Sequence, residues 1–151
     1  MKKKFAGYIN LKNLNGVLYP SSMQNIMMKD YVQNVLKGTF YLSPTEVLQA
    51  KYPITLRTLL GKETKIDGIV MLSSFYLPKE YKIREQIYSE SIKTKKKLYF
   101  ILDEMIFKNK LDKAKIEEFL FFKNNFFTET RTKLNKNEET FMKKFKKISF
   151  V

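Results

Sequence analysis

Short apolar runs alternate with longer segments in which apolar and polar residues recur at helical spacing. Each run is rich in aromatic or β-branched residues and is followed by Asn, Ser or Asp, which is typical of buried strands bounded by turns. The clearest example is the sequence IDGIVML, which is apolar and β-branched over most of its length. The pattern predicts four strands, at residues 4–9, 39–42, 66–72 and 98–102.

Helical periodicity separates these strands. A first helix is expected from Ser21 or Ser22, either of which can cap it, to about residue 37. Its predicted core face carries Met23, Ile26, Met27, Val32, Val35 and Leu36. A short second helix should span residues 54–60 and stop at Gly61, and a third should begin at Pro78 and reach about residue 94. Asp112 can cap a last helix over residues 113–132.

Strands that alternate with helices predict a three-layer α/β domain with an open, mostly parallel sheet of about four strands. We expect this core at residues 1–107 and a basic helical extension at residues 108–151. In the tail, Phe141, Phe145 and Ile148 would share one face of a helix, with lysines on another. Such a segment either lies on a membrane surface or, more commonly, packs on its own domain or on a second copy.

Composition limits the chemistry more than the charge does. The chain has no His and no Cys, which excludes a Cys nucleophile, a thiolate metal cluster, a disulfide and a His general base. The net charge is +14, but 26 of the 29 basic residues are Lys and they are dispersed. Base readers and phosphate clamps favour Arg, so the pattern disfavours nucleic acid as the partner.

Candidate site residues follow from the geometry of parallel sheets, in which ligands bind outside the carboxyl ends of the strands. Hydroxyl, amide and carboxylate residues gather in the segments predicted to lie there. Glu46 is the candidate acid–base residue, and the candidate substrate-binding residues are Asn10, Ser22, Gln24, Asn25, Ser73, Ser74 and Tyr76. Ordinary helix caps, turns and isolated acidic residues would produce the same pattern, so both interpretations stay open.

Other motifs are missing from the sequence. Residues 1–151 contain no GxGxxG, Walker or GxSxG motif and no metal-ligand spacing, so no cofactor and no metal are expected. The longest apolar run, residues 98–102, is far shorter than a membrane span, and Lys2–Lys4 is not followed by the apolar stretch of a signal peptide. We therefore expect a cytoplasmic protein.

Eight short motifs occur in an order that resembles the sporadic carbohydrate cluster proteins, a small bacterial family. The resemblance implies a gene within a surface-polysaccharide or lipopolysaccharide cluster and implies no settled reaction. Val32 and Tyr99 stand where the family tends to have Cys and His, so chemistry that relatives perform with those residues would be missing here. The motifs are Gly7-Tyr8-Ile9, Pro20 with Gln24-Asn25, Lys29-Asp30-Tyr31, Leu42-Ser43-Pro44-Thr45-Glu46, Asp67-Gly68-Ile69-Val70, Ser74-Phe75-Tyr76-Leu77-Pro78, Arg84 with Ile87-Tyr88, and Leu98-Tyr99-Phe100.

A more distant resemblance is to the catalytic domain of serine recombinases. Tyr8, the helix that carries Gln24, and the strand at residues 66–72 follow the order of that domain, which implies a resolvase-like fold. Its catalytic residues are replaced. Lys12 stands at the position of the nucleophilic Ser, Asn10 and Lys79 stand at positions of Arg, and Phe75 and Tyr76 replace an Asp-Arg pair. Recombination is therefore not expected.

Together these observations favour a protein of bacterial surface-carbohydrate biosynthesis that acts on or binds a phosphorylated or acidic sugar. In this hypothesis Gln24 and Asn25 would bind sugar hydroxyls, the cap at Ser22 would receive the anionic group, and Glu46 would transfer protons. The alternative is a non-catalytic scaffold or regulatory module that binds a partner protein, a second copy or nucleic acid through its basic surface or through residues 108–151. The sequence does not decide whether the protein is an enzyme.

Overall fold

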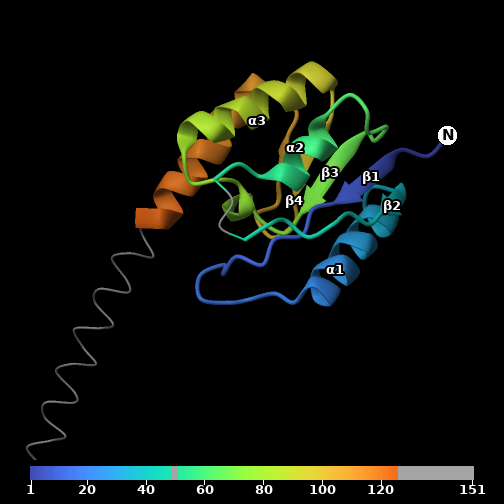
Figure 1. Cartoon of the computed structure of the whole chain (residues 1–151), viewed down its shortest axis with the longest axis horizontal. Helices are drawn as coiled ribbons and strands as arrows, with labels where there is room; N and C mark the ends of the chain where they lie inside the picture. The colour runs from blue at the N-terminus through green and yellow to red at the C-terminus, as the bar shows by residue number, and fades with distance from the viewer. Residues whose placement is uncertain (49–50, 126–151) are drawn as a thin grey trace, which may run out of the picture. The chain divides into compact units, whose positions relative to one another are not determined.

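The computed structural model describes residues 1–48 and 51–125, and residues 1–116 form one compact unit. Residues 117–125 belong to a second unit. The first unit is built on a five-stranded sheet with the strand order β2-β1-β3-β4-β5 (Figure 1). The strands are β1 (Lys4–Gly7), β2 (Thr39–Tyr41), β3 (Gly68–Met71), β4 (Lys97–Phe100) and β5 (Met105–Phe107).

The sheet confirms the predicted α/β class and its mostly parallel character. β1 pairs in parallel with both β2 and β3, and β3 pairs in parallel with β4. β5 runs antiparallel to β4. The prediction of about four strands missed β5, because three residues are too few to show a periodic pattern. A tight turn at residues 101–104 leads into β5. The last residue of this turn, Glu104, has a left-handed backbone with φ 53°.

Three α-helices connect or flank these strands: α1 (Ser21–Asn34), α2 (Ile54–Leu60) and α3 (Tyr81–Thr94). A 3-10 turn at Ser74–Tyr76 follows β3, and residues 110–125 are also helical. In Figure 1 the strands lie between α1 on one side and α3 on the other, which gives the predicted three layers. α1 packs on β1, β2 and β3, and α3 packs on β4 and α2. None of the described helices is long and apolar enough to cross a membrane.

The predicted core face of α1 was wrong in part. Met23, Ile26 and Val35 are exposed, and the residues that face the sheet are Gln24, Met28 and Val32. These three are spaced four residues apart and form a single stripe. A Gln can occupy this stripe because its amide is fully hydrogen-bonded to the backbone, as described below. The Ser cap is also wrong: Pro20 is the N-cap, and no side chain caps the helix.

Two later helix starts also differ from prediction. α3 begins at Tyr81 rather than at Pro78, because the 3-10 turn and an extended Leu77 come first. The last helix begins at residue 110 rather than 113. Its cap is Asn109, whose Oδ1 accepts the Leu111 N–H at 2.9 Å, while Asp112 Oδ2 accepts the Asn109 N–H at 3.3 Å. The end predicted at residue 132 and the amphipathic tail lie outside the described residues.

Close packing around β1 and β3 depends on two glycines. A Cβ on Gly7 would lie 2.6 Å from the Phe40 ring, and one on Gly68 would lie 2.9 Å from the Tyr99 ring. The aromatic side chains of β2 and β4 therefore cover the backbone of the two central strands. β1 and β3 pair in parallel, so their carboxyl ends lie at the same edge of the sheet.

Candidate ligand-binding site at the carboxyl edge of the sheet

The candidate site lies where the chain connections diverge from the middle of the sheet. β1 leads through α1 to β2 on one side, while β3 lies on the other side of β1 and leads through α3 to β4. In open α/β sheets this point, between the carboxyl ends of two adjacent parallel strands, is where ligands bind. Here the loop after β1 (residues 8–20) meets the loop after β3 (residues 72–80).

Gln24 fixes the loop after β1. It is fully buried, and its Nε2 donates to Asn10 O and to Tyr19 O, both at 2.8 Å. Its Oε1 accepts the Asn10 N–H at 3.4 Å. Because both amide hydrogens are engaged with the backbone, Gln24 acts in this structure as a positioning residue. From the sequence, Gln24 and Asn10 were both candidate site residues, and Gln24 was predicted to contact sugar hydroxyls.

Glu46 is a buried carboxylate that holds α2 against β1. Its Oε1 accepts the N–H groups of Val47 and Thr55 at 3.1 Å each. Its Oε2 accepts the Leu56 N–H at 3.1 Å and the Tyr8 hydroxyl at 3.0 Å. Burial raises the pKa of Tyr8 well above its ordinary value, so this phenol stays neutral and donates. Four protein donors therefore surround the residue that the sequence suggested for acid–base chemistry.

Asn10 joins these two groups. Its Nδ2 donates to the Tyr8 hydroxyl at 3.3 Å, and its Oδ1 accepts the Lys12 N–H at 3.0 Å. The structure thus brings together Asn10, Gln24 and Glu46 in one hydrogen-bonded chain at the end of β1. Ser22 is exposed in the first turn of α1, away from this chain of bonds.

The two serines after β3 bind a single carboxylate. Ser73 Oγ donates to Asp103 Oδ1 at 2.9 Å, and Ser74 donates to Asp103 Oδ2 through both its N–H and its Oγ, each at 2.6 Å. Ser73 Oγ also accepts the Phe75 N–H at 3.2 Å and so caps the 3-10 turn. Asp103, from the turn after β4, therefore sets the path of the loop after β3.

Two polar atoms at this edge are buried without a hydrogen-bond partner among the described residues: the Tyr76 hydroxyl and Asn25 Oδ1. Tyr76 is only 1% exposed. Burial, with a smaller effect of the nearby Tyr19, raises the pKa of Tyr76 to about 12, so its hydroxyl is neutral and able to donate. Buried polar groups are nearly always paired in proteins, so each unpaired one calls for an explanation such as a bound water, ion or ligand.

Sequence reasoning missed three cations at the same edge. Lys12 Nζ donates to Phe75 O and Leu77 O, both at 3.4 Å. Arg84 Nη1 donates to the next two carbonyls along the loop, Pro78 O at 3.0 Å and Lys79 O at 2.6 Å. Burial and the charges of Lys79 and Arg84 lower the pKa of Lys12. We call Lys12, Lys79 and Arg84 the cation cluster.

The sequence does not predict the cation cluster, because its members are far apart along the chain and lysines are common throughout it. One feature of the sequence could have indicated the cluster. Lys12 and Lys79, which replace residues of the recombinase pattern, both introduce a cation at the carboxyl edge of the sheet. In the part of the chain that the structure describes, no group of acidic, His or Cys residues is arranged to hold a metal ion.

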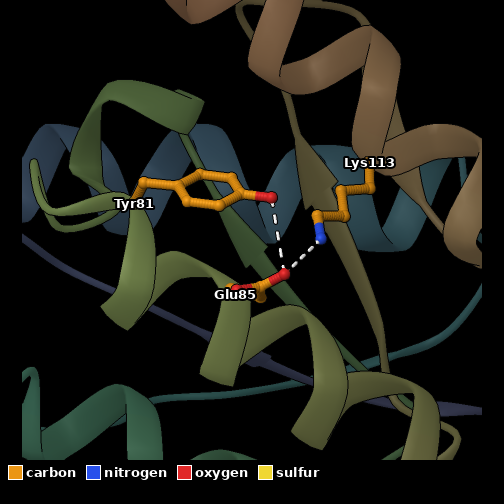
Figure 2. Close-up of polar contacts among 3 residues, drawn as sticks. All are labelled: Tyr81, Glu85 and Lys113. Carbon is orange, nitrogen blue, oxygen red and sulfur yellow. Dashed lines mark hydrogen bonds and ion pairs between the residues drawn. The ribbon is translucent and has the colours of Figure 1, made fainter.

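A surface contact lies at the beginning of α3, next to the cation cluster. Glu85 Oε1 accepts the Tyr81 hydroxyl at 3.4 Å and the Lys113 ammonium at 2.9 Å (Figure 2). The Tyr81 ring also lies 5.7 Å from the Arg84 guanidinium carbon and 5.3 Å from Lys113 Nζ. This contact ties α3 to the first turn of the helix that begins at residue 110.

Comparison with known proteins supports the fold. The chain is similar in structure to the N-terminal catalytic domain of TP901-1 integrase, with a TM-score of 0.56 and 13% sequence identity. The match covers 85% of this chain and 99% of that domain. No family model and no curated protein matches the sequence, so the resemblance to carbohydrate cluster proteins gains no support there. The likeness establishes a resolvase-like α/β fold and, at this identity, does not carry over the activity.

Proposed function

We propose that this domain binds a phosphorylated or acidic sugar at the carboxyl edge of its sheet and serves bacterial surface-carbohydrate biosynthesis. The observation that carries the proposal is the pair of unpaired buried atoms, the Tyr76 hydroxyl and Asn25 Oδ1. One is a donor and the other an acceptor, which suits a ligand with many hydroxyl groups. The biological setting rests on the sequence resemblance alone.

The surrounding hydrogen bonds favour a preorganised binding site. Gln24 and Asn10 fix the loop after β1, while Asp103 fixes the loop after β3 through Ser73 and Ser74. Rigid loops reduce the entropy lost when a ligand binds. In this proposal Asn25 and Tyr76 contact the sugar, while Asn10, Gln24, Ser73 and Ser74 hold the loops in place.

Replacing Tyr76 by Phe separates ligand binding from folding. The change removes only a hydroxyl that has no partner among the described residues, so we expect the free energy of unfolding to stay the same or rise by about 1 kcal/mol. The affinity for the sugar ligand should fall by about 3- to 10-fold. Tyr41→Phe, at an exposed tyrosine of β2, is the matched control and should change neither quantity.

The assay is an NMR titration of the full chain with a panel of sugar 1-phosphates and uronic acids. Equal affinities for the wild type and Tyr76→Phe, or no binding by the wild type at millimolar concentrations, would refute the proposed site. The biological setting is tested separately by metabolite profiling of a deletion strain. An unchanged sugar-phosphate pool together with an unchanged surface glycan would argue against that setting.

A second candidate function, a scaffold that binds a protein, is favoured by exposed apolar residues on and near α1. Val17, Leu18, Met23 and Ile26 are each about half exposed or more. Light scattering coupled to size-exclusion chromatography tests whether the chain self-associates. If it does, Ile26→Lys should return the chain to a monomer, whereas a monomeric wild type would remove self-association as the function.

A further inference from the structure

We propose that the cation cluster of Lys12, Lys79 and Arg84 is a subsite for the dianion of a phosphate monoester. This inference rests on the proposed function and refines it, since it makes the ligand a sugar phosphate rather than a uronic acid. It also assigns the anionic group to the cation cluster instead of to the start of α1, where the sequence suggested Ser22.

The position of the cations is set by one stretch of backbone. The carbonyls of residues 75, 77, 78 and 79 turn toward the side chains of Lys12 and Arg84, and all four accept hydrogen bonds from them. The two side chains, from the loop after β1 and from α3, therefore approach the loop after β3 at adjacent points. That loop also supplies the third cation, Lys79.

Two of the three charges in the cation cluster, those of Lys12 and Lys79, have no carboxylate partner among the described residues. Like charges held close together disfavour one another, and the lowered pKa of Lys12 reflects this together with its burial. A dianion bound among them would relieve that repulsion more fully than the single charge of a carboxylate.

Access and chemistry agree with this assignment. Lys79 is exposed, while Lys12 and Arg84 are half-buried, so the cluster opens to solvent on one side. The Lys12 ammonium has three hydrogens, and its two carbonyl contacts leave one to donate. A phosphate monoester offers three strong acceptor oxygens, which can receive hydrogen bonds from several cations at once.

The test uses isothermal titration of the full chain with glucose 1-phosphate, inorganic phosphate, glucuronate and glucose. The variants are Lys12→Met and Lys79→Met, and the second removes an exposed side chain that the fold does not need. Lys62→Met is the matched control, because it removes the same charge from an exposed lysine just after α2, at the opposite edge of the sheet. We expect each cluster variant to weaken glucose 1-phosphate binding by about 10-fold and the control by less than about 2-fold.

Dependence on pH provides a second measurement. The second pKa of a phosphate monoester is about 6, so binding of glucose 1-phosphate should be stronger at pH 7.5 than at pH 5. Binding of glucuronate, which keeps its single charge over this range, should change little. A wild type that prefers glucuronate to glucose 1-phosphate would overturn the assignment of a dianion.

The outcomes distinguish the subsite from the proposed function. If glucose 1-phosphate binds equally well to the wild type and to both cluster variants, the subsite is wrong although the sugar site stands. If inorganic phosphate binds as tightly as glucose 1-phosphate and depends on the cluster, the subsite stands but glucose is not recognised, which counts against the sugar site. If the wild type binds neither, the subsite is refuted.

Discussion

Replacing Glu46 by Gln removes acceptor capacity from a buried site while preserving shape. Oε1 and Oε2 each accept two hydrogen bonds, from Val47 and Thr55 on one side and from Leu56 and Tyr8 on the other. The new amide nitrogen accepts none, so two donors lose their acceptor in either orientation. If that nitrogen replaces Oε2, the Tyr8 oxygen can accept from it, but the Tyr8 hydroxyl hydrogen and the Leu56 N–H both lose their acceptor.

An unpaired buried donor costs about 1–3 kcal/mol, and hydrogen bonds to a carboxylate are stronger than those to an amide. We therefore expect Glu46→Gln to lower the free energy of unfolding by about 2–3 kcal/mol, measured by urea denaturation at pH 7. Glu63→Gln, at an exposed residue before β3, should change it by less than about 0.5 kcal/mol.

The same pair of variants separates a structural role from an acid–base role. If the role of Glu46 is structural, the free energy of unfolding should fall markedly for Glu46→Gln and change by less than about 0.5 kcal/mol for the control Glu63→Gln. If Glu46→Gln proved as stable as the wild type, the hydrogen bonds that we assign to the carboxylate would not support α2, and the reasoning would fail. That result would instead favour acid–base chemistry as the role of the Glu46 carboxylate.

Three further predictions concern other contacts of the first unit. Asp103→Ala should cost about 1–3 kcal/mol in urea denaturation, because the donors of the loop after β3 lose their acceptor. Lys95→Gly should raise stability by up to about 1 kcal/mol, since Lys95 has φ 57° after α3, whereas Lys93→Gly inside the helix should lower it by about 1 kcal/mol. The hydrogen bond from Lys113 lowers the pKa of Glu85 below its ordinary value of 4.5. The small stabilisation from this pair should therefore be present above pH 4.5 and disappear as the pH falls through the lowered value, and a wild type and Glu85→Gln with parallel acid-unfolding curves would contradict it.

Much of the secondary structure could be predicted from local pattern. The four parallel strands overlap their predicted ranges, and α2 has the predicted bounds and ends at Gly61. Errors occurred where local pattern carries little information. β5 has three residues, and its place in the sheet depends on pairing with β4 through the turn at residues 101–104. The start of the last helix depends on Asn109, a capping residue three positions before the one predicted.

The orientation of α1 shows why apolar pattern alone can mislead. Met23, Ile26 and Val35 were expected to face the core because they are apolar, but they are exposed. Gln24 takes an inward position because the backbone carbonyls of Asn10 and Tyr19 satisfy its amide. Residue hydrophobicity cannot reveal this, since a buried polar side chain is stable only when tertiary structure provides its partners.

The alternation of strands and helices can be predicted from the sequence, and with it the α/β class and the edge at which polar residues gather. These features follow from local periodicity and from the geometry of parallel sheets. The role of each polar residue at that edge depends on the tertiary structure. It engaged Gln24, Glu46 and Asp103 in hydrogen bonds, left the Tyr76 hydroxyl without a partner among the described residues, and brought Lys12 to Arg84 across 72 positions of sequence. The hydrogen-bond partners of a buried polar group and the charges near an ionised one are often distant along the chain. Folding brings these groups together, so local sequence pattern does not reveal them.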